Sequence, residues 1–324
     1  MARQTKLVPK LTTTQIALSK SSRTSQSLWQ EAFRNLFRNR SAIMGMIIIA
    51  ALLIIAVAAP LIAPYAPNLQ LFNDPAHRGQ GALPGRAPCI HVLGCPAEQP
   101  EHLMGLDLNA RDMFSRVLYG SQISLFVGFT SVFFSIIIGS LLGMVAGYAG
   151  GWVDNAIMRF MDVLLAFPSL LLAIAIVTFL GPGLQNALLA IAIVSIPAYA
   201  RLARASVLQV KEYEYITAVR TLGAPPVRIL FGHILPNVLT PLIVQGTLGI
   251  GTAVLDAAAL SFLGLGAQPP DPEWGAILSE GRNRVFTQPH LVFFPGLAIM
   301  LTVLGFNLLG DGMRDALDPR LNRI

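Results

Sequence analysis

Most of the chain consists of long apolar segments without a charged residue, separated by shorter segments that hold the charges. An α-helix needs about 20 apolar residues to cross the hydrocarbon core of a bilayer. The apolar segment 163–200 is too long for one crossing, and Gly181-Pro182-Gly183 divides it into two. The pattern therefore predicts six transmembrane helices, at about 42–64, 121–148, 162–180, 184–201, 237–264 and 291–311.

Composition supports a membrane protein. The 324 residues are 54% hydrophobic and 12% charged, with a mean hydropathy of +0.61, whereas soluble domains are roughly 25% charged. The apolar segments are continuous and lack the alternation of transmembrane strands. The predicted fold class is an all-α, polytopic membrane protein with six transmembrane helices.

The basic residues indicate the orientation in the membrane, because Lys and Arg collect on the cytoplasmic side. With the N-terminus inside, the inside segments carry 17 of these residues and the two long outside loops, 65–120 and 266–290, carry 6. Both termini are therefore predicted to be cytoplasmic. The net charge of +6 reflects this topology, and no soluble domain is evident that could carry a nucleic-acid-binding patch.

The N-terminal 41 residues are predicted to be a cytoplasmic tail. Residues 1–27 are rich in Ser, Thr, Gln and Lys and are expected to be disordered. Residues 29–40 alternate apolar and basic positions at helical spacing, which predicts a helix along the inner membrane surface; a plain tail is the alternative. No cleavage pattern accompanies the first apolar segment, so we expect a retained anchor. The other expected divisions are a first transmembrane helix at 42–64, an extracytoplasmic loop at 65–120, a core of five transmembrane helices at 121–313 and a cytoplasmic tail at 314–324.

Both cysteines, Cys89 and Cys95, lie in the predicted extracytoplasmic loop. Thiols in an oxidising compartment are expected to pair, and Gly94 and Pro96, on either side of Cys95, can turn the chain so that a small loop closes. Free thiols are one alternative. A metal site with His91 is another, although three ligands are fewer than a structural zinc site requires.

Three further positions carry candidate roles. Asp256 is the one acid deep inside a predicted span, so it should face the translocation path or a partner rather than lipid. Trp274, among prolines in an outside loop, fits either a surface for another protein or an interfacial anchor. Gly139, Gly143 and Gly147 recur at an interval that lets helices pack closely, within the chain or against a partner.

A polar segment, KEYEYITAVRTLGAPPVRILFGHILPNVLTPLIVQG at 211–246, lies between two apolar runs. It resembles the cytoplasmic EAA loop of ABC importer permeases, which docks on an ATPase subunit. The match rests on Thr217-Ala218-Val219, Gly223 and Leu235-Pro236. A short helix over 212–222 is predicted, with a turn at Gly223 and a restart at Pro225. The resemblance implies a coupling loop, 205–236, whose candidate residues are Glu212, Glu214, Thr217, Ala218, Val219, Arg220, Leu222, Gly223, Ala224, Pro225, Leu235 and Pro236.

Four more blocks narrow the resemblance to the C-type permease subunit of the dipeptide, oligopeptide and nickel importers. In HLMGLDLNARDMFSRVLYGSQISL, Gly105, Asp107, Arg111 and Asp112 match that family, whereas Leu106 and Ala110 replace its usual Thr and Gly. The charges there are expected on a short interfacial helix with an i,i+4 pair, or on a solvated face. The other similar blocks are 147–174, 259–282 and 293–320.

The resemblance implies a complex. Its expected partners are a homologous B-type permease in a heterodimer, two ATPase subunits, an extracytoplasmic substrate-binding protein and the lipid bilayer, with no nucleic acid. The chain has no G-x-x-x-x-G-K-[ST] phosphate loop and no hydrolase or metal constellation. We therefore expect a transport subunit without catalytic or metal-binding residues and without a cofactor of its own, with ATP and Mg²⁺ on the ATPases, in a bacterial plasma membrane.

The expected function is ATP-driven import of di- or oligopeptides. Within the same family, a nickel or glutathione importer is an alternative. An ion-driven secondary transporter is a further alternative, but such proteins usually carry several ionisable residues or broken helices at mid-membrane, and here Asp256 alone is well inside.

Overall fold

The structure, a computed structural model, describes residues 34–73, 83–96 and 99–317. The expectations for 1–27, for the first part of 29–40 and for the end of the C-terminal tail lie outside these residues. The described part is helical and contains no β-strand. Its helices are α3 (Arg40–Ile62), α4 (Met113–Ala149), α5 (Gly151–Leu165), α6 (Ser169–Leu180), α7 (Leu184–Val210), α8 (Glu214–Thr221), α9 (Pro226–Ile229), α10 (Leu235–Phe262), α11 (Trp274–Gly281) and α12 (His290–Leu317).

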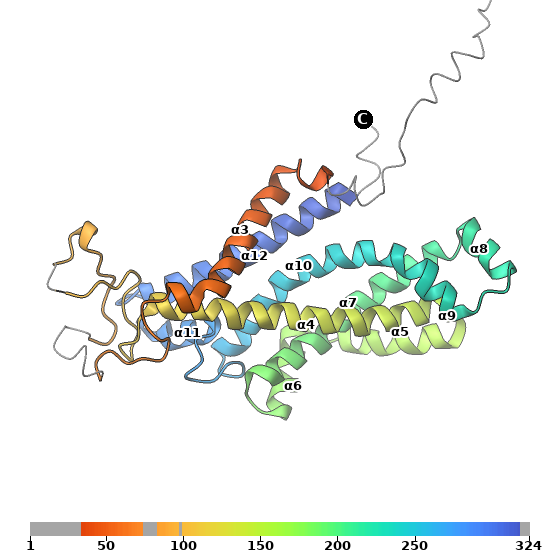
Figure 1. Ribbon diagram of the computed structural model, residues 1–324. Coiled ribbons are helices and arrows are strands. Elements are labelled where there is room, and N and C mark those ends of the chain that lie inside the picture. The colour runs from red at the N-terminus through yellow and green to blue at the C-terminus, as the bar shows by residue number, and fades with distance from the viewer. Residues whose placement is uncertain (1–33, 74–82, 97–98, 318–324) are drawn as a thin grey trace, which may run out of the picture.

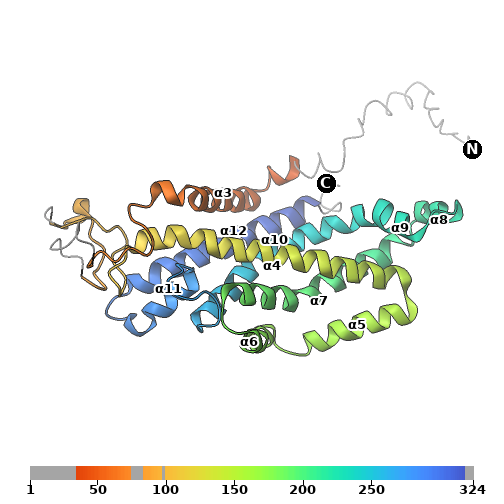
Figure 2. The same cartoon turned by 60° about the horizontal axis from the view of Figure 1, so that its bottom comes forward.

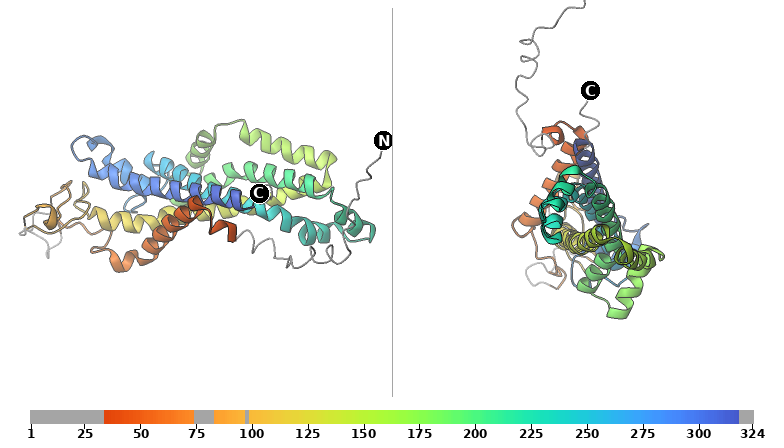
Figure 3. Two further views of the ribbon diagram at one scale, coloured as in Figure 1. Left: turned by 90° about the horizontal axis from the view of Figure 1, so that it is seen from above. Right: turned by 90° about the vertical axis from the view of Figure 1, so that its right-hand side faces the viewer.

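The molecule is an elongated bundle with two distinct ends (Figure 1). The loop between α3 and α4 and the short helix α11 lie at one end, and α8 and α9 lie at the other. The first end is the extracytoplasmic one and the second is cytoplasmic, according to the distribution of basic residues. An end-on view shows the long helices gathered into one bundle (Figure 3).

Five helices are long and apolar enough to cross a membrane, namely α3, α4, α7, α10 and α12. The sixth crossing differs from the continuous helix expected over 162–180. There α5 and α6 meet at an angle of 90° and count as one span only if the bent pair is taken together; Figure 2 shows the change of direction. The break lies at Ala166–Pro168, because Pro168 has no N–H to donate and disfavours a helical residue before it.

The ends of the other spans are set by local caps. Helix α4 begins at Met113, earlier than expected, because the Asp112 side chain accepts a hydrogen bond from the Ser115 N–H at 2.8 Å. Gly181 and Gly183 have φ values of 95° and 153°, and they form the predicted break between α6 and α7. Helices α7 and α12 extend beyond the apolar segments toward the cytoplasmic end.

Small residues bring the central helices together. A Cβ added to Gly139 of α4 would lie 2.7 Å from the Ile196 carbonyl oxygen of α7, and Gly143 and Gly147 face Ala200 and Val207 of α7 in the same way. The glycine pattern therefore packs α4 against α7 within this chain. On the other side, Gly45 of α3 lies against the Leu309 backbone of α12, so α3 stays close to α12 (Figure 1).

Candidate functional site

The cytoplasmic end is built around α8, a short amphipathic helix. Ile216 is completely buried, and Val219 and Ala224 pack beside it against the main core. The observed helix, Glu214–Thr221, is shorter at both ends than the 212–222 expected from the sequence. One face of α8 is therefore anchored to the bundle, and the opposite face is open.

Gly223 makes the turn that follows α8. Its φ of 81° lies in the left-handed region, which side chains rarely adopt. Its N–H donates to the Arg220 carbonyl at 3.0 Å, and the Ala224 N–H donates to the Val219 carbonyl at 3.3 Å. Pro225 is then extended, and α9 starts directly after it. The turn at Gly223 and the restart after Pro225 are as the sequence predicts.

The open face of this segment is partly apolar. Leu222, between α8 and α9, is 86% exposed, and Val227 of α9 is 66% exposed. Helices α8 and α9 lie at the tip of the molecule (Figure 1). Exposed apolar side chains rimmed by polar ones are typical of a protein-binding surface. The other predicted coupling residues that are exposed are Glu212, Glu214, Thr217, Ala218, Arg220, Gly223, Pro225 and Pro236, whereas Leu235 is half-buried.

Polar contacts connect this segment to the transmembrane helices. The Arg220 guanidinium carbon lies 5.9 Å from the centre of the Tyr148 ring, just before the end of α4. Asn237 of α10 donates to the Tyr215 hydroxyl at 3.1 Å and to the His233 carbonyl at 2.8 Å. No role for Tyr148, Tyr215 or Asn237 was predicted from the sequence. Tyr215 and Asn237 do lie within the polar segment 211–246, which is the one feature of the sequence that points to them.

A π-helix, Leu230–Ile234, joins α9 to α10. In its wider turn the Leu235 N–H donates a hydrogen bond to the Leu230 carbonyl, five residues earlier. Pro236 explains this, because a proline donates no N–H and its ring collides with the carbonyl four residues earlier. The predicted Leu235-Pro236 pair thus lies where the cytoplasmic segment ends and the membrane helix α10 begins. Short π-helical turns within α-helices are frequent at functional sites.

Two ion pairs hold α5 against α7 near the cytoplasmic end. Asp154 accepts two hydrogen bonds from Arg204, at 2.5 and 2.6 Å. Asp162 accepts one from Arg201 at 2.6 Å, and both of these side chains are about half exposed. These local pairs account for the acids at the inner interface.

Asp256 lies half-buried on α10 and has no hydrogen-bond or ion-pair partner among the described residues. It shares one face of the helix with Thr252 and Gln245, since the three recur at helical spacing. Leu239 and Ile243, also exposed, lie on a different face. Helix α10 therefore presents one polar and one apolar open face.

At the extracytoplasmic end, Cys89 and Cys95 form a disulfide with a Cα–Cα distance of 5.4 Å. The Cys89 backbone also pairs with His102, which holds the small loop against the rest of the segment. The His91 ring lies 2.7 Å from the Gln99 carbonyl oxygen. Within the described ranges, no group of His, Cys, Asp and Glu side chains could hold a metal ion.

A buried network of charges lies beneath this loop. Asp107 bonds to Arg111 at 2.5 Å, and Arg111 bonds to Glu280 of α11 at 2.6 Å. Arg116, which is fully buried, lies 3.4 Å from both Asp107 and Glu280. The expected i,i+4 pair is present between Asp107 and Arg111. The expectation of a solvated face or a short interfacial helix is wrong, because residues 107–111 form a turn and their charges neutralise each other in the interior.

Trp274 is also interior. It is 1% exposed, and its Nε1–H donates to the Val117 carbonyl of α4 at 3.0 Å. Both expected roles, a protein-binding surface and an interfacial anchor, are therefore wrong. Glu273, just before it, caps α11 by accepting from the Ala276 N–H at 3.0 Å, and burial raises the pKa of its carboxyl.

Comparison with protein families shows which family this chain belongs to. Residues 139–323 match the model of the binding-protein-dependent transport system inner membrane component, more than half of the chain. The chain belongs to this family. Residues 27–83 of this permease also match the N-terminal transmembrane domain of oligopeptide transport permease C, so it is a C-type subunit of the peptide importer group.

Curated relatives agree with this placement. The dipeptide transport system permease protein DppC of Alkalihalophilus pseudofirmus is 50% identical over 300 residues, 92% of each chain. The di/tripeptide permease DppC of Pseudomonas aeruginosa is 46% identical over 292 residues, 90% of this chain and 92% of the relative. The glutathione permease GsiD of Pectobacterium atrosepticum is 45% identical over 311 residues, 96% of each.

A solved structure shares the fold. The inward-facing methionine ABC transporter MetNI superimposes with a TM-score of 0.53 at 22% identity, covering 64% of this permease and 98% of that chain. The permease is therefore a multi-pass inner membrane subunit of an ABC importer, which forms part of the translocation path. An ion-driven secondary transporter is not supported.

Proposed function

We propose that this permease imports di- or oligopeptides as half of a heterodimer with a B-type permease, driven by two ATPase subunits and supplied by an extracytoplasmic binding protein. The observation that carries the proposal is the segment α8–Gly223–α9, anchored by Ile216 and open at Leu222, at the cytoplasmic end of a chain 50% identical to a dipeptide permease. The ATP and Mg²⁺ belong to the ATPases, because this chain has no phosphate-binding loop.

The segment transmits motion because it is connected to several helices at once. Ile216 and Val219 fix α8 in the core, and Arg220 and Asn237 connect it to α4 and α10. When the ATPases close on ATP, a force on α8 therefore acts on those helices together. The permease then changes between inward- and outward-facing states as a rigid-body switch, driven by the different affinity of its partners for each state.

Asp256 faces the translocation path in this proposal, where it attracts the cationic amino terminus of a peptide. An unpaired carboxylate at this depth is costly against lipid, and a water-filled path solvates it. The polar side chains of Thr252 and Gln245 on the same face support this orientation. The alternative within the proposal is a contact between Asp256 and the partner permease.

Glutathione is a second candidate substrate, because the glutathione permease of Pectobacterium atrosepticum is 45% identical over almost the whole chain. Like a dipeptide, it offers an amino group and carboxylates to the same path. Nickel import is a weaker candidate, since none of the relatives described above carries that name.

The test is to purify the complex through a tag on this chain, identify the co-purified subunits, and reconstitute it in vesicles with its binding protein. We expect ATP-dependent uptake of a labelled dipeptide at a higher rate than glutathione or a nickel chelate. Uptake of glutathione but not of the dipeptide would show that the proposed substrate is wrong and that the proposed transport function is right. Isolation of the chain without an ATPase or a second permease, together with ATP-independent uptake, would overturn the proposal.

A further inference from the structure

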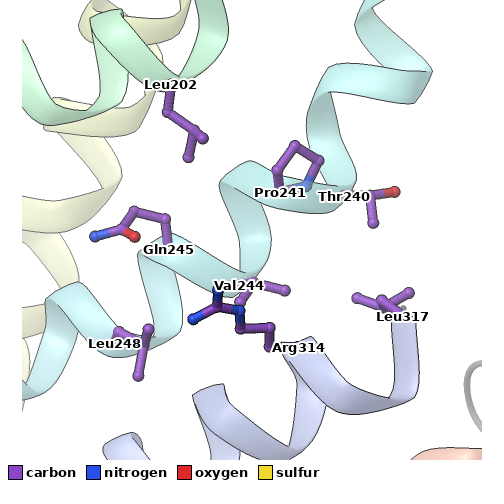
Figure 4. Close-up of a pocket in the computed structure, with 8 residues that line it drawn as sticks. All are labelled: Leu202, Thr240, Pro241, Val244, Gln245, Leu248, Arg314 and Leu317. Carbon is purple, nitrogen blue, oxygen red and sulfur yellow. The ribbon is translucent and has the colours of Figure 1, made fainter. Parts of the chain in front are cut away.

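A cavity of about 460 Å³ lies between three transmembrane helices in the cytoplasmic half of the molecule (Figure 4). Its volume is within the roughly 300–1,000 Å³ typical of small-molecule sites. Helix α10 supplies most of the wall, and α7 and α12 supply the rest. The lining residues are Leu202, Thr240, Pro241, Val244, Gln245, Leu248, Arg314 and Leu317.

Arg314 is the only charged residue in this lining. Its side chain extends from α12 toward α10 and ends beside Val244 (Figure 4). No ion pair or hydrogen bond of Arg314 occurs within the part of the chain that the structure describes. Gln245 and Thr240 add polar atoms to an otherwise apolar wall. The cavity therefore combines apolar surface with one exposed cation that has no ion-pair partner among the described residues, which suits an anion on a small, partly apolar molecule.

The cavity continues the polar face of α10. Gln245 lines the cavity and lies on the face that carries Thr252 and Asp256. Helix α10 runs outward from Leu235, so Asp256 lies about three turns further from the cytoplasm than Gln245. On α12, Asn307 and Asp311 are exposed and share a face with Arg314. Gln245 of α10 and Arg314 of α12 therefore line the same cavity, and each belongs to a polar face of its own helix.

We propose that this cavity binds the terminal carboxylate of the transported peptide at the cytoplasmic end of the path, with Arg314 as the specificity-determining residue. This inference rests on the proposed function. The guanidinium pairs with the carboxylate, Gln245 and Thr240 contact the adjoining amide, and Leu202, Val244 and Leu248 contact the side chains. Asp256 attracts the amino group on the way in, so the two ends of a zwitterionic peptide meet opposite charges at different depths.

Two ordinary reasons for an arginine at this position do not explain its direction. A cation near the C-terminus of α12 is favoured by the helix dipole, and Lys and Arg are enriched on the cytoplasmic side. Either reason is satisfied equally by an arginine outside this cavity, such as the exposed Arg159 of α5. Arg314 is exposed as well, but its side chain also forms part of the wall of the cavity.

The test measures binding to the purified complete transporter without its binding protein, so that selection by that protein does not contribute. Equilibrium dialysis compares labelled Ala-Ala with Ala-Ala amide, which lacks the negative charge. We expect the wild type to prefer Ala-Ala, and R314Q to bind it about tenfold more weakly, because a charge-assisted hydrogen bond is lost. Binding of the amide should not change in R314Q, and the matched variant R159Q should behave as the wild type.

Several outcomes overturn the inference. These are equal binding of Ala-Ala and its amide by the wild type, or unchanged Ala-Ala binding by R314Q. Thermal stabilisation by phosphatidylglycerol that depends on Arg314, without any peptide effect, would instead identify an anionic lipid site and also overturn it. ATP-dependent uptake by the wild-type vesicles tests the proposed function separately: uptake that persists while the binding result fails rejects this site alone.

Discussion

Arg111 and Glu280 are 169 positions apart in the sequence, yet the Arg111 Nη2 lies 2.6 Å from the Glu280 Oε2. This bond joins the extracytoplasmic loop to α11, and Asp107 and Arg116 complete the network. The Arg116 Nε and one of its Nη atoms make no hydrogen bond within the described residues. The acids therefore compensate two buried guanidinium groups, and the loop is fixed to the membrane helices by charge as well as by packing.

Glu280→Gln should destabilise the permease strongly. The change leaves Arg111 and Arg116 with one carboxylate, and breaking a buried ion pair typically costs about 3–5 kcal/mol; the 25% exposure of Glu280 places the cost at the lower end. Thermal unfolding of the purified protein in detergent measures it. Glu101→Gln is the matched control, because its pair with His91 is exposed and the expected loss is within about 1 kcal/mol. Equal melting temperatures for the two variants would contradict the role of the network.

Gly223→Leu should leave membrane insertion intact and separate ATP hydrolysis from transport. Nothing lies within 4 Å of an added Cβ, so the change acts through the φ of 81°, which costs a side chain about 1–2 kcal/mol. Uptake and ATPase rates of the reconstituted complex are the measurements. The matched control is Gly264→Leu, which introduces similar strain at the other end of the molecule, because Gly264 has a φ of 80° and nothing within 4 Å of an added Cβ. Normal coupled uptake by Gly223→Leu would reject the coupling assignment.

Replacing Cys89 and Cys95 together with serine should lower the stability of the permease by about 2–3 kcal/mol, because the disulfide limits the unfolded chain. Mass spectrometry of non-reduced protein, alkylated after extraction from the membrane, checks the bond directly. We expect neither thiol to be modified until a reductant is added. Free alkylation of both thiols before reduction is the result that would reject the pairing.

Asp256→Asn should reduce the transport of peptides with a free amino terminus while assembly and basal ATPase activity persist. The amide cannot attract a cation, but it keeps the size and polarity of the side chain. Uptake of a free and an N-acetylated dipeptide is compared in vesicles. Loss of assembly before any loss of transport would assign Asp256 to the contact with the partner permease instead. A variant equal to the wild type in uptake, assembly and stability would show that Asp256 is exposed to water near the end of the span and has neither role.

Glu273→Gln should remove one pH dependence of stability. Burial raises the pKa of Glu273 in the folded state, so the folded protein holds this proton more tightly than the unfolded chain. Its contribution is fully present below the ordinary pKa of glutamate and is lost as pH rises through the folded value. Melting temperatures across acidic to neutral pH should therefore fall more for the wild type than for the variant. Parallel curves would contradict the assignment.

The hydrophobic pattern by itself determined five of the membrane helices, because each must present about 20 apolar residues to lipid whatever its neighbours are. The sixth segment is bent by 90° between α5 and α6 and is not the continuous helix that the pattern predicts. The sequence also located the break at Gly181–Gly183 and the turn at Gly223, where the backbone conformation depends on the local residue. The cytoplasmic segment was found from its own residues for the same reason. Its anchoring by Ile216 could be inferred only in part, since burial depends on what packs beside it.

Tertiary structure alone decided how distant segments meet. Nothing in the sequence pairs Arg111 with Glu280, so the sequence predicts an interfacial helix or a solvated face for Arg111 and its neighbouring acids, which the fold buries instead. Trp274 read as a surface residue because its segment is a loop, yet it fills a site against Val117 of α4. From the sequence, Arg314 is only one of the basic residues on the cytoplasmic side, and the packing of α10, α7 and α12 makes it part of the wall of a cavity. Local sequence determines backbone conformation and membrane insertion, whereas the partner of a charged or aromatic side chain depends on the packing of helices far apart in the chain.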